Sequence, residues 1–327
     1  MHSVPKILVA ARKEIRMRHL GYRTEKAYLD WIYRFFTFHG AIRQADLTEP
    51  DVATFLSFHA VNKQASASTQ NQALCAIRFL YRHVLKRSLD PVGFIKAEKD
   101  TSLPEVFLKE EVTRILEKLK GEKWLMVSLM YGCGLSLNEC LSLRIRDIDI
   151  ENEEITIHTS SDEISRKLML PRALQEPLRK RIETLKYRYL TLWLKGYCGV
   201  VLPHGLEKKY PEETRNFQWF FLFPSPEPLR DRRTRKIKIH HRSDTYIQRA
   251  VRKCLESEGI HKQVSCQSFR HSFAVHLLEE GYDIRVVQQL MGHKNLRNTM
   301  VYKHLMNRGK ILPISPLDHI MGEIHQK

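Results

Sequence analysis

The amino-acid sequence predicts a mainly α-helical protein that carries one small β-hairpin, an α+β fold built from two domains. Its 327 residues are the length of about two domains. Apolar residues recur at helical spacing through most of the chain. One segment, between residues 154 and 170, instead alternates apolar and polar residues as paired strands do.

Residues 1–88 are expected to form a bundle of four helices. Apolar side chains follow a helical period over 7–15 and again over 28–36. A third helix begins at Thr48, because Asp51 stands three residues later as an acidic partner in the first turn. A fourth helix begins near residue 68, so the first domain is a small helical bundle.

A linker and a larger second domain follow the bundle. Residues 89–104 hold prolines, a glycine and a charged run that interrupt the helical period, which indicates a linker. Residues 105–327 form the second domain, with a hairpin of residues 154–158 and 167–170. Residues 197–245 are irregular and contain five prolines and an aromatic run. Helices are expected at 109–120, 123–132, 137–143, 172–196, 244–258, 268–280, 283–291 and 296–310.

The charge of the chain points to a polyanionic partner. Lys and Arg number 54 against 37 Asp and Glu, which gives a formal net charge of +17. No apolar run is long enough to cross a membrane, and the N-terminus does not read as a secretory signal. The cysteines form no CxxC pair, and HExxH, GxxxxGK[ST] and GxGxxG patterns are missing. Neither a metal nor a cofactor is therefore expected.

The segment from 266 to 304 gathers residue types suited to phosphate chemistry. Arg270, His293 and Tyr302 fall on consecutive short helices, which can direct the three side chains into one cleft. An arginine offers a planar fork to a phosphate, and a histidine donates to a phosphate oxygen or moves a proton. A tyrosine can attack phosphorus and form a covalent ester.

These residues lie in motifs that resemble those of the tyrosine recombinases. The segment containing Arg270, Gly292-His293 and Tyr302 resembles the family's HxxR…[HW]…Y block, and residues 131–149 resemble its first block. The N-terminal bundle is similar to the family's core-binding, SAM-like domain, which precedes a tyrosine-recombinase catalytic domain. Residues 197–245 are similar to the insertion that marks integron integrases. The resemblance covers the whole chain.

The resemblance implies site-specific DNA recombination through a 3′-phosphotyrosyl intermediate. Tyr302 would be the nucleophile, and Arg270 and His293 would hold the scissile phosphate, whose transition-state charge an electrostatic clamp stabilises. The implied partners are duplex DNA and folded single-stranded recombination sites. A homo-tetramer on DNA is expected, with the tail after Tyr302 packing on a neighbouring protomer. The implied location is the bacterial cytoplasm, in association with the nucleoid.

Three further catalytic positions depart from the family pattern. Ser136 stands where the family has the first arginine, Ser161 where it has the hairpin lysine, and Gln267 where it has the histidine of HxxR. Loss of an arginine that stabilises phosphoryl transfer typically costs about 10³–10⁵ in rate. Strand cleavage is therefore expected to be impaired. Lys167 on the returning strand is the remaining candidate for a general acid.

DNA-binding candidates lie in the insertion-like segment. By resemblance, Trp219, Pro203, His240 and His241 are candidates to hold unpaired bases, since stacking contributes roughly 1–3 kcal/mol per base. The basic run from Arg230 to Arg242 is expected to contact phosphates. Its candidate residues are Arg230, Arg232, Arg233, Arg235 and Lys236. By contrast, His271 and His276 are expected in core or solvent roles.

Two other functions remain open at this point. One is a catalytically inactive DNA-binding relative, a competitor at recombination sites or a decayed integrase, which a covalent-adduct assay distinguishes from an active enzyme. The other is a basic RNA-binding or nucleoid protein. Such a protein would not need Arg270, His293 and Tyr302 in the order and spacing of the recombinase motif, so their presence argues against it. Preference for folded DNA hairpins over random RNA would exclude the latter.

Overall fold

The structure is a computed structural model that describes residues 4–18, 20–40, 47–89, 93, 103–159, 162–197, 199–203, 206–230, 236–303 and 305. The chain divides into two compact units, Met1–Ser102 and Leu103–Lys327. Within the described ranges, no helix is both long and apolar enough to cross a membrane.

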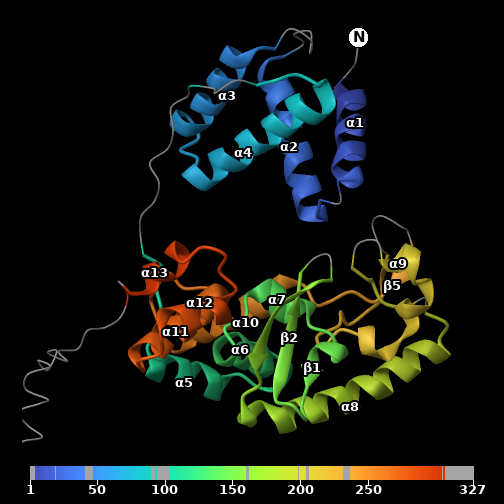
Figure 1. The fold of residues 1–327 in the computed structure, drawn as a ribbon, viewed down its shortest axis with the longest axis vertical. Helices are drawn as coiled ribbons and strands as arrows, with labels where there is room; N and C mark the ends of the chain where they lie inside the picture. The colour runs from blue at the N-terminus through green and yellow to red at the C-terminus, as the bar shows by residue number, and fades with distance from the viewer. Residues whose placement is uncertain are drawn as a thin grey trace, which may run out of the picture. The chain divides into compact units, whose positions relative to one another are not determined.

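The first unit is the expected helical bundle (Figure 1). Its core is aromatic: the rings of Phe35 and Phe55 pack edge to face with centroids 5.3 Å apart, and Trp31 packs against them. The expected start at Thr48 is confirmed, since its backbone N–H donates to Asp51 Oδ2 at 2.8 Å. The helices are α1 (Val4–Met17), α2 (Tyr22–Phe38), α3 (Glu49–Val61) and α4 (Ala67–Phe79), which continues into the π-helical η1 (Leu80–Leu85).

The second unit is a helical domain with two hydrophobic clusters, a large one and a smaller one that includes Phe273 and Tyr302. At its centre α6 and α11 lie against each other, and the rings of Phe107 and Phe269 stack at 4.6 Å within the large core. The expected helices are present with small shifts at their ends; of the expected 296–310, the structure describes a helix up to Lys303. They are α5 (Lys109–Lys118), α6 (Gly121–Gly132), α7 (Leu137–Ser142), α8 (Arg172–Leu194), α10 (Asp244–Ser257), α11 (Cys266–Glu279), α12 (Ile284–Met291) and α13 (Arg297–Lys303).

A three-stranded antiparallel sheet confirms the predicted hairpin and adds one short strand. It is formed by β1 (Ile148–Asp149), β2 (Glu154–His158) and β3 (Ile164–Met169), in that order. The strand β3 begins three residues earlier than expected. Successive side chains of a strand point to opposite faces, so Arg166 shares the face of buried Leu168 while Lys167 lies on the other.

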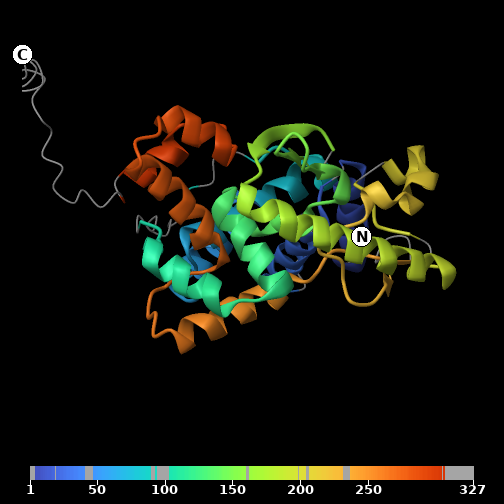
Figure 2. The same ribbon diagram turned by 90° about the horizontal axis from the view of Figure 1, so that it is seen from below.

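The segment 197–245 is irregular, as expected, but it packs closely on the second unit. Figures 1 and 2 show it beside the C-terminal end of α8. Phe220, Phe221 and Phe223 enter the large core. Arg144, which precedes the 3₁₀ turn η2 (Ile145–Asp147), forms an isolated antiparallel β-bridge with Phe221. Its short elements are α9 (Leu206–Lys209), η3 (Pro211–Arg215), η4 (Phe217–Trp219), β4 (Leu229–Arg230) and β5 (Ile237–Lys238).

Candidate active site

Three of the sequence-predicted residues come together at the junction of α11, α12 and α13. The ring of Tyr302 on α13 stacks with that of His293 at a centroid distance of 6.1 Å and an angle of 22°. Arg270 on α11 donates to the Met291 carbonyl at the end of α12. The glycine that follows, Gly292, has a φ of +64°, which ends α12 in a left-handed turn and leads the chain into His293.

The guanidinium of Arg270 is deeply buried and fixed by backbone oxygens. Its side chain is 9% exposed, and its Nη1 donates to the Gly134 carbonyl at 2.8 Å. Burial lowers the pKa of Arg270, and the Glu139 carboxylate opposes that effect. The fork is therefore held in one orientation, as required of a group that binds a phosphate without rearranging.

Glu139 joins Arg270 to a second guanidinium, that of Arg166. Arg166 donates to Glu139 Oε1 at 2.8 Å and to Oε2 at 3.1 Å, while Arg270 Nη1 donates to Oε2 at 3.0 Å. Arg166 also donates from Nε to the Leu290 carbonyl at 2.7 Å. Burial raises the pKa of Glu139, but the guanidiniums and the Ser136 N–H outweigh it and leave the pKa below its ordinary value.

Ser136 is the helix cap of α7. Its Oγ accepts from the Glu139 N–H at 3.3 Å, and its own N–H donates to Glu139 Oε2 at 2.8 Å. The position that the resemblance assigns to an arginine thus holds a short hydroxyl engaged in capping, and the carboxylate beside it belongs to the Arg166–Glu139–Arg270 cluster.

The hydroxyl of Tyr302 contacts His271, a residue that was expected in a core or solvent role. Tyr302 is 3% exposed, and its Oη lies 2.8 Å from His271 Nδ1. Burial, followed by the charges of Arg270 and His293, lowers the pKa of His271 to about 4, so the imidazole is neutral at pH 7. Burial raises the pKa of Tyr302. The phenol therefore keeps its proton and shares a hydrogen bond with the neutral imidazole, which places His271 in the site.

The other substituted positions supply no cation that the structure describes. Gln267 is half-buried in the first turn of α11, and Ser161 lies outside the described residues. Lys167 does not reach the site: its Nζ donates to Glu154 at 2.6 Å on the face of the sheet opposite Arg166. The candidate for a hairpin acid is thus engaged elsewhere.

The proposed base-binding residues occupy varied environments. Trp219 is 8% exposed: its indole N–H donates to Glu213 at 2.8 Å, and the Arg146 guanidinium lies 3.5 Å from its ring centroid. The rings of His240 and His241 are half-buried and meet at 4.1 Å. Pro203 is half-buried at the start of the turn into α9.

The basic run is divided between the surface and the interior. Arg230 and Lys236 are exposed, whereas Lys238 is buried against Glu207 and Arg242 pairs with Glu122. The phosphate contacts expected of the run therefore do not include Lys238 and Arg242, because both are paired with carboxylates. Arg232, Arg233 and Arg235 lie outside the described residues.

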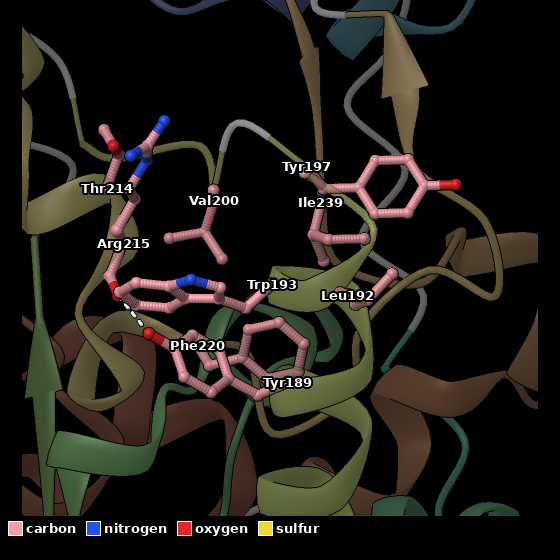
Figure 3. Close-up of a pocket in the computed structure, with 11 residues that line it drawn as sticks. Tyr189, Leu192, Trp193, Tyr197, Val200, Thr214, Arg215, Phe220 and Ile239 are labelled. Atoms are coloured by element: carbon pink, nitrogen blue, oxygen red, sulfur yellow. Dashed lines mark hydrogen bonds between the residues drawn. The ribbon is translucent and has the colours of Figure 1, made fainter.

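A cavity of about 130 Å³ opens between α8 and the insertion-like segment. Figure 3 shows the aromatic rings of Tyr189, Trp193 and Phe220 gathered on one side, with Val200 and Ile239 facing them. The Tyr189 hydroxyl donates to the Arg215 carbonyl and fixes one wall. Trp193 on α8 is 56% exposed, so an aromatic surface beside the segment is open to solvent.

Three residues of the site are not among the candidates predicted from the sequence: Glu139, Arg166 and His271. The sequence signals that could have identified them differ. The Ser136–Glu139 spacing is a capping box, which fixes Glu139 at the start of α7. Strand alternation separates Arg166 from Lys167 once β3 is assigned. No local pattern reveals His271, because its partner Tyr302 is 31 residues away and meets it only when α13 packs on α11.

Comparison with known proteins shows the family. Residues 105–308 match the "Phage integrase family" model, and residues 7–90 match "Phage integrase, N-terminal SAM-like domain". An "Integrase/recombinase" of Escherichia coli is 38% identical over 96% of this chain and 93% of its own length. A "Tyrosine recombinase" of Pseudothermotoga lettingae is 28% identical over 93% and 94%. The chain therefore belongs to the phage integrase family of tyrosine recombinases.

Solved structures share the fold at low sequence identity. The XerH site-specific recombinase bound to palindromic difH substrate is 18% identical with a TM-score of 0.60, over 99% of this chain and 85% of that one. The Tn1549 transposon integrase in complex with transposon right end DNA is 16% identical with a TM-score of 0.60, over 98% of both chains. Together with the two family models, these likenesses support a SAM-like domain followed by a tyrosine-recombinase catalytic domain.

Proposed function

We propose that this chain is a DNA-binding site-specific recombinase of the integron integrase type whose own strand cleavage is impaired. The observation that carries the proposal is the pairing of an assembled Tyr302–Arg270–His293 group with a helix cap at Ser136. In this proposal Tyr302 is the nucleophile and Arg270 supplies one guanidinium of the family's clamp. The second guanidinium is replaced by a hydroxyl that has no charge to offer a phosphate.

Electrostatics explain why cleavage suffers. Phosphoryl transfer depends on cations placed at the equatorial oxygens, and removal of one such arginine typically costs about 10³–10⁵ in rate. Arg166 brings a guanidinium close by, but it shares the Glu139 carboxylate with Arg270, and that carboxylate offsets one of the two positive charges. The described cluster of Arg166, Glu139 and Arg270 therefore carries a single net positive charge.

Duplex DNA is the proposed partner. The chain has a net charge of +17, and two structures that share its fold, XerH with difH and the Tn1549 integrase, are described as DNA complexes. A cationic surface binds the phosphate backbone largely without regard to sequence. The exposed Arg230 and Lys236 are proposed contacts, together with Arg232, Arg233 and Arg235.

Folded single-stranded sites with unpaired bases are the proposed integron-type substrate. The segment 197–245 offers stacking surfaces in Trp219, His240 and His241, and it also contains Pro203. The Arg146 guanidinium covers the Trp219 ring, so a base that stacks there has to displace it. We further propose a homo-tetramer on DNA and a cytoplasmic, nucleoid-associated location.

A covalent-trapping assay tests the proposal. The substrate is a suicide form of DNA that the chain itself selects from a pool of random duplexes and folded single strands. We expect strong binding but little tyrosyl adduct, and a rise in adduct when Ser136→Arg, Ser161→Lys and Gln267→His are combined. Tyr302→Phe in the same background is the control that has to abolish the adduct. An adduct yield from the native chain equal to that of an intact relative contradicts impaired cleavage.

The alternative is a catalytically inactive DNA-binding relative, and the Ser136 cap is the observation that favours it. Under this alternative the restored variant also forms no adduct, while DNA binding persists. A basic RNA-binding or nucleoid protein is a more remote alternative. It predicts equal affinity for random RNA and for folded DNA hairpins, measured in competition at one salt concentration.

A further inference from the structure

We propose that His271 is a catalytic residue that accepts the proton of the Tyr302 hydroxyl during strand cleavage. The inference rests on the proposed function, because it assigns a role within that reaction. It starts from a direct contact, the 2.8 Å distance between Tyr302 Oη and His271 Nδ1. A general base has to lie within about 2.6–3.2 Å of the atom that it deprotonates, and this pair meets that condition.

Two other candidate side chains, those of Gln267 and His293, do not offer the same function. Gln267 carries an amide, which does not take up a proton at ordinary pH. His293 places its ring nearly parallel to that of Tyr302, and its Nδ1 lies 2.9 Å from Thr299 Oγ1. His293 is therefore positioned by Thr299 beside the Tyr302 ring, while His271 faces the Tyr302 oxygen.

The surroundings keep His271 neutral until a phosphate enters. The charged and titratable groups acting on it are Arg270 of its own helix, His293 after α12 and Tyr302 of α13. Burial and Arg270 favour the neutral imidazole, which is the form able to accept. A phosphodiester bound at Arg270 brings a negative charge that favours the imidazolium instead. Substrate binding thus increases the basicity of His271 when it is needed.

The step balances without a cofactor. The phenol proton passes from Tyr302 Oη to His271 Nδ1 as the Oη–phosphorus bond forms. The bond from phosphorus to the 5′ oxygen breaks, its electron pair leaves with that oxygen, and the oxygen takes a proton from solvent. No group is oxidised or reduced. In the reverse attack by a 5′ hydroxyl, the His271 imidazolium returns the proton to the departing tyrosine.

The first test reads the tautomer of His271 and requires no cleavage. The full chain is labelled with ¹⁵N at histidine, and the His271 signals are assigned by their loss in His271→Asn. We expect a neutral ring with the proton on Nε2 and a bare Nδ1 at pH 7, and a shift of the Nδ1 signal in Tyr302→Phe. A ring protonated on Nδ1 makes Tyr302 the acceptor and overturns the proposal.

The second test separates proton transfer from positioning. It measures single-turnover adduct formation in a Ser136→Arg/Ser161→Lys parent on DNA with a 5′-bridging sulfur, whose leaving thiolate needs no acid. Asparagine at 271 can still accept a hydrogen bond from Tyr302 but cannot take its proton. We expect His271→Asn to slow the adduct rate about 10²-fold, with imidazole in the buffer restoring part of the rate in His271→Ala.

The chain supplies a matched control on the same helix. His276 Nδ1 lies 2.9 Å from the Tyr131 hydroxyl, so His276→Asn perturbs a similar pair on α11 away from the nucleophile. It should leave the adduct rate unchanged. An equal rate in His271→Asn and its parent overturns the proposal. No adduct in the parent counts instead against the proposed function, and the tautomer measurement still decides the role of His271.

Discussion

At the scale of single residues, the site is defined by where charge is buried. His271 has a pKa of about 4 in the folded chain against an ordinary value of 6.5. The folded chain therefore binds fewer protons than the unfolded chain between these values, and unfolding becomes easier as the pH falls through that window.

This difference gives a prediction for stability against pH. Between pH 6.5 and 4, the native chain should lose up to about 3 kcal/mol more unfolding free energy than His271→Asn. Urea unfolding at several pH values measures it. His261→Asn, at an exposed histidine, should follow the native chain. Parallel pH curves for the native chain and His271→Asn would show that His271 titrates normally.

Gly292 gives a second prediction at this scale. A Cβ on Gly292 would lie 2.8 Å from Arg166 Nη1 at a φ of +64°, whereas one on Gly281, at a φ of +88°, meets no atom within 4 Å. Both alanine variants strain the backbone, by about 1–2 kcal/mol. Gly292→Ala should lose a further 1 kcal/mol or more in urea unfolding, about the cost of overpacking. Equal losses would mean that Arg166 moves aside freely.

The residue-scale contacts mark the limit of what the sequence could predict. Tyr302, Arg270 and His293 were accessible because their order and spacing follow a family motif. The contacts of Arg166 with Glu139, and of Tyr302 with His271, join residues 27 and 31 positions apart. Such contacts depend on how α7, β3, α11 and α13 pack, and no local period encodes that packing.

At the scale of elements, the insertion-like segment is fastened to the domain by a buried arginine. Arg144 donates to the Trp219 carbonyl at 2.6 Å and to the Val201 carbonyl at 2.9 Å, and its guanidinium lies over the Phe221 ring at 4.2 Å. Burial lowers the pKa of Arg144 to about 10. The sequence indicated an irregular aromatic segment here, but the periodicity of apolar residues does not show that an arginine anchors it.

This anchor predicts a local effect of mutation. Arg144→Met keeps an apolar stem but leaves the Trp219 and Val201 carbonyls without their donor, at a cost of about 1–3 kcal/mol each. Limited proteolysis should then cut within 197–245 faster than in the native chain, with Arg179→Met on α8 as the control. Unchanged cleavage of the segment would show that its aromatic core alone holds it.

At the scale of the whole molecule, the positive charge has two uses. Some cations form ion pairs within the protein, as Lys238 does with Glu207 and Arg242 with Glu122. Other cations, Arg230 and Lys236 among them, are exposed at the surface. The composition predicted the polyanion, but which cations are internal could be learned only from the fold.

The available charge predicts a steep dependence of binding on salt. If the chain neutralises about 6–10 phosphates, its DNA affinity should fall about 10³–10⁵-fold between 50 and 200 mM salt. Fluorescence anisotropy on duplex DNA measures the slope, and Arg230→Ala should reduce it by close to one ion. An affinity that does not change with salt would contradict binding led by phosphates.

If the nucleophile is assembled while its electrostatic clamp is incomplete, restoring the clamp should raise the rate of cleavage. Single-turnover formation of the tyrosyl–DNA adduct is measured for the native chain and for Ser136→Arg/Ser161→Lys/Gln267→His on the same selected DNA. We expect the restored chain to react at least about 10³-fold faster. Equal rates in the two chains, both abolished by Tyr302→Phe, would contradict it.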